Sequence, residues 1–459
     1  MRPLLALSVL VAAASAMAQS TPAEFLGGST PRGKGGKAIY RMEDGILVGE
    51  AVAKSPNTFL STDKEYGDFV LEYDFKVDPR LNSGVQIRSH AYDKDTTFVD
   101  GAGKTQTIAA GKVHGYQIEI DTDPDNQGNR QWTGGLYEEG RRLWLVPGLL
   151  GGDKKAFSEQ GRRLTKIGDW NHVKIEAVGP RIRTWLNGEL RVDAMDGDSP
   201  RGFIGFQVHS VNKPELVGTQ NRWRNVRLTE VAPNTLTETE KAEGWTLLFD
   251  GTSTDAWRAV KGDTFPAKGW VARDGVLTVL RSDGGESTGG GDIVTKRTYK
   301  AFEFTTEFRI TEGANSGIKY FAQPALNKGA GSAFGLEFQI LDDARHPDAK
   351  LGRDGNRTIG SLYDLITAKS DKLVRPIGEW NHALVRCLDG KRVEHWLNGR
   401  LTVSYERGSE DFRAARAKSK YADPKYGADF GEWSEGNILL QDHGNEVSFR
   451  SIKVRQAGN

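Results

Sequence analysis

Apolar and polar residues alternate along much of the chain with the period of two that is typical of β-strands. The alternation is clearest at residues 69–77, 172–178 and 302–310. Each of these stretches predicts an antiparallel strand with one face in a core and the other facing solvent. The period of an amphipathic helix is nearly absent, except at 412–420, where Ala, Arg and Lys predict a short surface helix or a loop.

Short segments of the first half of the chain recur, in the same order, in the second half. The order is preserved while the spacing drifts, which indicates two diverged copies of one domain rather than a short-period solenoid. Each copy spans about 200 residues, enough to enclose a sandwich core. The recurring pairs are Asn-Ser-Gly at 82–84 and 315–317, a Gly-to-Asp stretch at 115–123 and 335–343, Leu-Tyr at 136–137 and 362–363, Trp-Asn-His at 170–172 and 380–382, and Trp-Leu-Asn-Gly at 185–188 and 396–399.

Turn residues separate the predicted strands in both copies. Asn-Gly pairs at 187–188 and 398–399 lie between β-rich runs and predict tight hairpins. Many short strands in domains of this size predict an all-β fold of two tandem jelly-roll β-sandwiches. We expect the first domain at residues 38–230, a polar linker at 231–243 and the second domain at 244–459.

The N-terminus has the composition of a secretory signal peptide at residues 1–18. Arg2 supplies a positive charge, residues 4–14 form a short apolar stretch, and Ala-Met-Ala at 16–18 matches a cleavage site. The apolar stretch is too short to cross a bilayer, so no transmembrane segment is expected. The sequence therefore predicts an exported protein, periplasmic or secreted from a bacterium, with residues 19–37 as an N-terminal extension.

Composition removes several classes of function. The net charge is +1 and Lys and Arg form no run, so there is no electrostatic case for binding nucleic acid or an anionic membrane. No dinucleotide or phosphate-loop fingerprint and no Gly-x-Ser-x-Gly elbow is present in a suitable context. Cys387 lies in an apolar alternation, which predicts a buried structural thiol.

The second copy carries a series of sequence blocks that resembles the 3-keto-disaccharide hydrolase domain family, formerly a domain of unknown function. The resemblance covers 244–456 closely and 38–230 more loosely, because the first copy lacks the opening Leu-Phe-Asp-Gly block. It implies a concanavalin-like jelly roll, similar to laminarinase-type glycoside hydrolases, and an activity on glycosides oxidised at C3 of the sugar. The blocks are Gly-Trp-Thr-Leu-Leu-Phe-Asp-Gly at 244–251, Asp-Ala-Trp at 255–257, Ala-Asn-Ser-Gly-Ile-Lys-Tyr-Phe at 314–321, Gly-Leu-Glu-Phe-Gln-Ile-Leu-Asp at 335–342 and Gly-Glu-Trp-Asn at 378–381.

Within these blocks, polar residues spaced two apart predict one polar sheet face in each copy. Glu337 and Gln339 share a face, while Phe338 and Ile340 point to the core. The same spacing joins Asn315, Gly317 and Lys319, and joins Gln441 to His443; Asp342 ends the acidic strand. The corresponding residues of the first copy are Gln117, Glu119 and Asp121 on one strand, Asn82, Gly84, Gln86 and Arg88 on another, and Gln207 and His209 on a third.

The resemblance implies a particular chemistry for this face. A 3-keto group acidifies the C2 hydrogen, so a base can remove it, the enolate can expel the aglycone from C1, and water can then add. This route needs one base and one electrophile rather than the paired carboxylates of ordinary glycosidases. We assign Glu337 or His443 as general base or acid, and Lys319, Asn315 or a metal ion as enolate stabiliser. The residues assigned to substrate binding are Asn315, Gln339, Asp342 and Gln441 of the second copy, and Asn82, Arg88, Gln117, Glu119, Asp121 and His209 of the first.

Three questions stay open at this point. A divalent metal could use Glu337, Asp342, His346 and His443, although these residues have no short ligand spacing. The second copy is the preferred catalytic unit, and the first is either a second active site or a carbohydrate-binding module in which Trp132, Trp144 and Trp223 could stack on sugars. The whole chain could instead be a non-catalytic periplasmic glycan-binding protein. If it is the enzyme, a separate sugar 3-dehydrogenase must supply the oxidised substrate.

Overall fold

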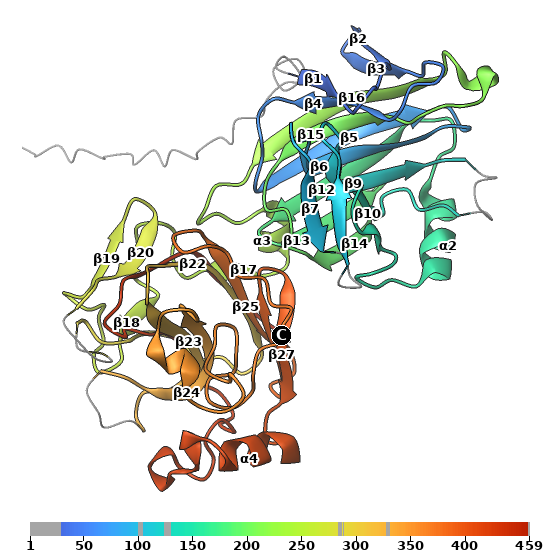
Figure 1. Ribbon diagram of the computed structural model, residues 1–459. Coiled ribbons are helices and arrows are strands. Elements are labelled where there is room, and N and C mark those ends of the chain that lie inside the picture. Colours follow the sequence, from blue (N-terminus) through green and yellow to red (C-terminus); the bar gives the residue numbers. More distant parts are fainter. Residues whose placement is uncertain are drawn as a thin grey trace, which may run out of the picture. The chain divides into compact units, whose positions relative to one another are not determined.

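The computed structural model describes residues 29–99, 104–123, 130–282, 287, 289–326 and 331–457 (Figure 1). The predicted signal peptide and the first part of the N-terminal extension lie outside these residues. Contacts divide the chain into two compact units. The first contains residues up to 230, except for two short segments, Ala177–Ile182 and Asp193–Pro200, that group with the second, which otherwise starts at Val231.

The first unit is a sandwich of two antiparallel sheets of seven strands each. One sheet has the order β1 (Ser29–Arg32), β4 (Thr58–Thr62), β15 (Phe203–Val208), β6 (Asn82–His90), β9 (His114–Asp121), β10 (Leu136–Glu139) and β11 (Leu143–Val146). The other has the order β14 (Glu189–Met195), β13 (Arg181–Leu186), β12 (Asn171–Val178), β5 (Phe69–Val77), β16 (Gln220–Glu230), β3 (Ile46–Glu50) and β2 (Ile39–Glu43). A hairpin of β7 (Thr96–Val99) and β8 (Thr105–Ile108), the helix α2 (Lys154–Leu164) and the turn η2 (Pro214–Leu216) complete it.

The second unit repeats this architecture. Its larger sheet has the order β19 (Trp270–Arg273), β20 (Val276–Val279), β29 (Val447–Gln456), β22 (Phe302–Ile310), β25 (Asn381–Cys387), β26 (Arg392–Leu397) and β27 (Arg400–Glu406), and β17 (Trp245–Leu247) pairs with β29. The smaller sheet has the order β18 (Trp257–Ala259), β21 (Ile293–Thr295), β28 (Asn437–Leu440), β23 (Asn315–Gln323) and β24 (Phe334–Leu341). The short helices are α3 (Glu238–Ala242), α4 (Glu410–Ala417), η3 (Pro347–Lys350), η4 (Lys420–Ala422) and η5 (Pro424–Tyr426).

The alternation in the sequence determines which face of each strand enters the core. On β24, Phe338 and Ile340 are fully buried and belong to the main hydrophobic cluster of the second unit. In the first unit, Phe206 of β15 packs edge-on against Trp223 of β16, which lies in the opposite sheet. The two units are therefore jelly-roll sandwiches, as expected, and Trp223 belongs to a core. Cys387 is buried and free, as predicted.

The helices agree with the sequence prediction in one place and differ from it in two. The segment at 412–420, expected to be a short surface helix or a loop, overlaps α4, which begins at Glu410 after the N-cap Ser409. The expected linker contains α3, started by a capping box between Thr237 and Glu240. Helix α2 was not predicted, although its buried residues Phe157, Gly161 and Leu164 follow helical spacing.

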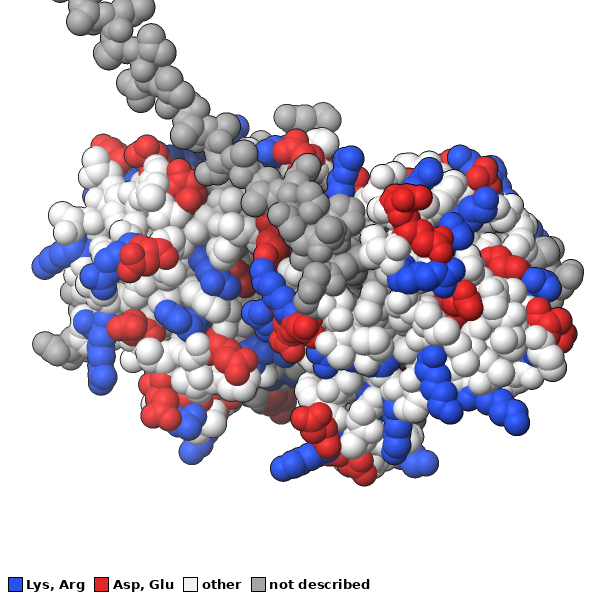
Figure 2. All heavy atoms as spheres, turned by 90° about the horizontal axis from the view of Figure 1, so that it is seen from above, with Lys and Arg blue, Asp and Glu red and all other residues white. Residues whose placement is uncertain are grey.

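Charged side chains of both signs are spread over the face of the molecule shown in Figure 2. Among the described residues on the face in Figure 2, basic and acidic side chains are interspersed without a continuous patch of one sign. None of the described helices is long and apolar enough to cross a membrane.

Candidate active site

A polar cavity of about 190 Å³ lies on the outer face of the smaller sheet of the second unit. Its floor comes from three adjacent strands, β28, β23 and β24. Because successive side chains of a strand point to opposite faces, residues spaced two apart meet here. The floor residues are Asn315, Lys319, Glu337, Gln339, Gln441 and His443, which are six of the seven residues that the sequence predicted for this site.

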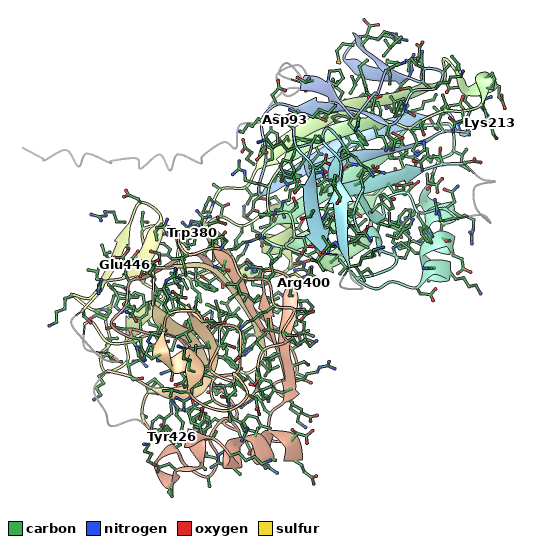
Figure 3. The ribbon with its side chains drawn as sticks, in the orientation of Figure 1. Asp93, Lys213, Trp380, Arg400, Tyr426 and Glu446 are labelled. Carbon is green, nitrogen blue, oxygen red and sulfur yellow. The ribbon has the colours of Figure 1, made fainter. Side chains whose placement is uncertain are left out.

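The walls of the cavity come from loops that the sequence analysis did not assign to the site. Ser332 lies just before β24 and Phe334 is its first residue, while Tyr421 and Tyr426 lie in the segment that follows α4. Figure 3 labels Tyr426. The rings of Phe334 and Tyr426 are 4.9 Å apart. These aromatic side chains give the polar floor an apolar rim.

Tyr363 and Lys420 complete the wall. The Lys420 ammonium lies 4.4 Å from the centre of the Tyr363 ring, and the Tyr363 hydroxyl donates a hydrogen bond to Asp348 at 2.9 Å. Burial, and next the negative charge of Glu337, raise the pKa of Tyr363 far above its usual value. Tyr363 is therefore a neutral hydrogen-bonding group near the Glu337 carboxylate.

Lys319 is the buried cation of the cavity. Its ammonium donates to Ser332 Oγ at 3.1 Å and to the Ala333 carbonyl at 3.4 Å. Ser332 Oγ in turn donates to Asp292 Oδ2 at 2.9 Å, and the ammonium lies 3.7 Å from the same oxygen. Asp292 is fully buried. Charge balance with Asp292 therefore keeps a positive charge at the cavity floor.

Glu337 is the cross-strand neighbour of Lys319 and is also almost fully buried. Its side chain lies directly over Gly317, where a Cβ atom would come within 2.3 Å of Glu337 Oε1 and 2.8 Å of Cδ. The glycine of the Asn-Ser-Gly motif thus makes room for the carboxylate of the next strand. In the first unit, Gly84 makes room for Gln117 in the same way.

This contact predicts the effect of a single methyl group. We expect Gly317→Ala to displace the Glu337 carboxylate and to lower turnover by about 10²-fold, because a shift of about 1 Å in a reacting group has effects of this size. Gly84→Ala, which displaces Gln117 instead, is the matched control and should leave turnover unchanged. Steady-state kinetics together with thermal melting separates the two variants, and equal losses in both would contradict the prediction.

Amide oxygens of the floor lack a hydrogen-bond partner within the described protein. Among them are Asn315 Oδ1 and Gln339 Oε1, and both of these side chains are almost fully buried. An unsatisfied buried carbonyl costs about 1–3 kcal/mol. Both oxygens line the cavity and can accept hydrogen bonds from the hydroxyl groups of a ligand.

His443 is half-buried at the edge of the floor, and its ring centre lies 6.0 Å from that of His346. Asp342, in contrast, does not line the cavity. Its carboxylate accepts backbone N–H groups of Gly313 and Ala344, because it lies in the turn just beyond β24. Among the described side chains, no group of three or more His, Cys, Asp or Glu is placed to hold a metal ion.

The first unit has an equivalent cavity of about 460 Å³. Asn82, Gln117, Glu119, Gln207 and His209 all line it, as the repeat predicts. Additional lining residues that the sequence analysis did not assign to the site include Arg130, Tyr137 and Glu139. Trp144, the candidate stacking residue, also lines this cavity.

Two predicted residues of the first unit lie elsewhere. A β-bulge after Ile87 gives Arg88 a φ of +46° and breaks the alternation, so Arg88 does not share the face of Asn82. Its guanidinium is buried and bonds the Gly67 carbonyl and Asp68. Asp121 ends β9 outside the cavity lining and pairs with Arg130 at 3.2 Å.

The Glu119 carboxyl lies in an unusual environment for an acid. Burial raises its pKa to about 7, against a hydrogen bond from Asn82 at 2.6 Å that favours the ionised form. In the unfolded chain the Glu119 carboxyl ionises near pH 4.5, so the native state keeps the Glu119 proton up to a higher pH than the unfolded state does. The stability of the first unit should therefore fall as pH rises from 4.5 to 7 and stay reduced above 7.

We expect Glu119→Gln to stabilise the first unit at pH 8 by about 3 kcal/mol and to have almost no effect at pH 4.5. The amide groups of Asn82 and Gln117 can rotate to suit the new donor and acceptor. Scanning calorimetry of the wild type and the variant at both pH values measures the difference. The same gain at both pH values would mean that ionisation of Glu119 is not the cause.

A jelly roll with a polar cavity of amides, a carboxylate, a lysine and aromatic side chains on its outer face has the features of a carbohydrate-active protein. Comparison with known families identifies it further. The model of the 3-keto-alpha-glucoside-1,2-lyase-like domain matches residues 23–229 and again residues 244–455. The chain belongs to this family and contains two copies of its domain.

Individual proteins that are similar to the chain include one named relative and several solved structures. The chain is 36% identical over 231 residues to a 3-keto-disaccharide hydrolase of Bacteroides thetaiotaomicron, which covers 47% of this chain and 79% of that protein. A solved structure from Parabacteroides distasonis, described as a candidate glycosyl hydrolase, is 33% identical, with a TM-score of 0.42, over 50% of this chain and all of that one. A carbohydrate-binding module of Bacillus subtilis is 15% identical, with a TM-score of 0.25, over 44% of this chain and 96% of that one.

Proposed function

We propose that the protein cleaves 3-keto-glycosides, including 3-keto-disaccharides, in the cavity of its second unit. The observation that carries this proposal is the neighbouring pair of Lys319 and Glu337 on β23 and β24, a buried cation beside a buried carboxylate. Both residues lie in the sequence blocks that match the family, and a named relative is a 3-keto-disaccharide hydrolase. A base and an electrophile are the two groups that an elimination next to a ketone requires.

In the proposed reaction Glu337 removes the C2 proton of the 3-keto sugar. The electron pair forms the enolate, whose oxygen is stabilised by the ammonium of Lys319. The enolate then re-forms the C3 carbonyl as the C1–O bond breaks, which leaves a C1=C2 double bond and releases the aglycone with a proton from solvent or His443. Water adds its oxygen at C1 and a proton at C2, so the net reaction is hydrolysis.

The remaining groups of the cavity position the sugar. Asn315 and Gln339 offer buried amide oxygens to hydroxyl groups, and the aromatic rim covers the apolar face of the ring. We prefer Glu337 to His443 as the base. Glu337 lies in the floor next to Lys319, whereas His443 lies at the edge of the floor. The chain itself carries no sequence fingerprint for a nicotinamide cofactor, so a separate sugar 3-dehydrogenase would supply the ketone. We also propose that the protein is exported, on the basis of its N-terminal sequence.

Two measurements test this function. Purified protein should release a chromogenic aglycone from a 3-keto-glucoside and not from the matching unoxidised glucoside. In D₂O the early product should carry one deuterium at C2, because elimination and hydration exchange that hydrogen, and a no-enzyme incubation of the product corrects for spontaneous enolisation. Release without deuterium at C2 would replace the elimination mechanism by direct displacement, and no release from any keto-glycoside would favour a glycan-binding protein.

A further inference from the structure

The cavity of the first unit retains the shape of a sugar site and lacks the reactive pair. The position of Lys319 is taken by Gln86, and that of Glu337 by Gln117, which are again cross-strand neighbours. The Gln86 amide donates to Gln117 Oε1 at 2.6 Å. Two neutral amides bonded to each other supply neither a base nor a cation for an enolate.

The first cavity does contain a carboxyl group, that of Glu119, but its surroundings differ from those of Glu337. Glu119 occupies the position of Gln339, and both of its oxygens accept hydrogen bonds, from Asn82 at 2.6 Å and from Gln117 at 3.0 Å. The guanidinium of Arg130 pairs with Asp121. Glu119 thus orders a network of amides, which is the role of a binding group.

Other features show that this cavity is built for a ligand. Gln207 is fully buried and lines the cavity, yet neither its amide nitrogen nor its amide oxygen has a hydrogen-bond partner within the described protein. One primary amide can donate to one hydroxyl of a sugar and accept from its neighbour. A ligand with adjacent hydroxyl groups satisfies both atoms.

The opposite wall is aromatic. Trp144 and Tyr137 pack edge to face at 5.1 Å, and Trp132 supports Trp144 at 4.5 Å. Trp144 is only partly buried and lines the cavity, where the Arg130 guanidinium lies 5.1 Å from the centre of its ring. Aromatic side chains of this kind pack against the C–H face of a pyranose while amides bind its hydroxyls.

We propose that the first unit binds a neutral sugar residue of an intact, unoxidised glycoside and does not cleave it. Gln207 recognises two adjacent hydroxyl groups, and Trp144 packs against the ring. The protein would then combine a binding site for unmodified glycan with a separate cavity for the keto sugar. This inference concerns a ligand without a keto group, so it does not depend on the proposed reaction.

Calorimetric titration of the full chain with methyl glucosides, trehalose, maltose, cellobiose and sucrose tests the inference. The Glu337→Gln variant, which is altered only in the second cavity, should bind at least one of these sugars at a single saturable site. Gln207→Ala and the conservative Trp144→Phe should each weaken this binding at least tenfold, while melting temperatures report on folding. The double variant Lys319→Gln with Asp292→Asn, in the other cavity, is the matched comparison.

Three results would overturn the inference. The first is the absence of binding to every probe. The second is binding that is weakened by the double variant Lys319→Gln with Asp292→Asn and not by the changes at Gln207 or Trp144. The third is a loss of keto-glycoside turnover in Gln207→Ala as large as that in Glu337→Gln, since the first cavity would then be the reaction site. Failure of the proposed reaction alone would leave the titration result intact.

Discussion

Glu337→Gln is expected to lower kcat/KM for a 3-keto-glucoside by about 10³-fold, within the range observed for loss of a general base. The change keeps the size and the hydrogen-bonding capacity of the side chain and removes the charge that accepts the C2 proton. The glutamine that it introduces is also the residue type found at the equivalent position of the first unit, Gln117. The loss should appear in the rate of C2 hydrogen exchange as well as in aglycone release.

A matched set of variants makes this expectation specific. Gln117→Ala changes the same position of the first unit and should retain turnover. Glu337→Ala should recover part of its activity when formate is added, because a small carboxylate can occupy the vacated space and act as the base. A loss below tenfold in Glu337→Gln, combined with a larger loss in His443→Ala, would transfer the role of base to His443.

The sequence predicted the core of each sandwich and the floor of each cavity for one physical reason. Strand side chains alternate strictly, so Phe69–Val77 and Phe302–Ile310 could be assigned as β5 and β22 to the residue. The same rule brought Lys319, Glu337 and Gln339 together on one face. Duplication strengthened the inference, since each polar position could be checked against its partner in the other copy.

The predictions fail where the regular geometry of a strand ends. Arg88 was assigned to the polar face, but it lies in a bulge with positive φ, and no residue type in that segment signals the bulge. Asp342 lies one residue beyond β24, where backbone N–H groups of a turn take up its carboxylate. Arg88 thus leaves the polar face because a bulge interrupts its strand, whereas Asp342 lies outside the cavity lining because it follows the strand end.

The walls of the cavities could not be predicted from local pattern at all. Tyr421 and Tyr426 follow α4, roughly a hundred residues after β23, and reach the cavity only through the tertiary fold. Ser332 and Asp292 position Lys319 from two separate loops. Contacts of this kind depend on how loops fold over the sheet, and a single sequence carries no periodicity that reports them.

Lys319 combines a structural and a chemical role, and the two can be separated. Removing its charge leaves Asp292 buried without its cation, and breaking a buried ion pair in this way costs roughly 3–5 kcal/mol. Lys319→Gln alone should therefore lose both stability and turnover. Loss of activity in that variant would not by itself show that the ammonium stabilises an enolate.

The double variant Lys319→Gln with Asp292→Asn resolves this ambiguity. The asparagine oxygen can still accept the Asp442 N–H, and its amide can donate to Ser332 Oγ, so these hydrogen-bond contacts survive without the charges of the Lys319–Asp292 pair. We expect the double variant to recover most of the lost stability while turnover stays about 10²–10³-fold below the wild type, the usual effect of losing one stabilising group at a developing oxyanion. Chemical denaturation and kinetics on the same samples measure both quantities. Recovery of activity together with stability would mean that Lys319 only maintains the fold, and the enolate would then need a different electrophile.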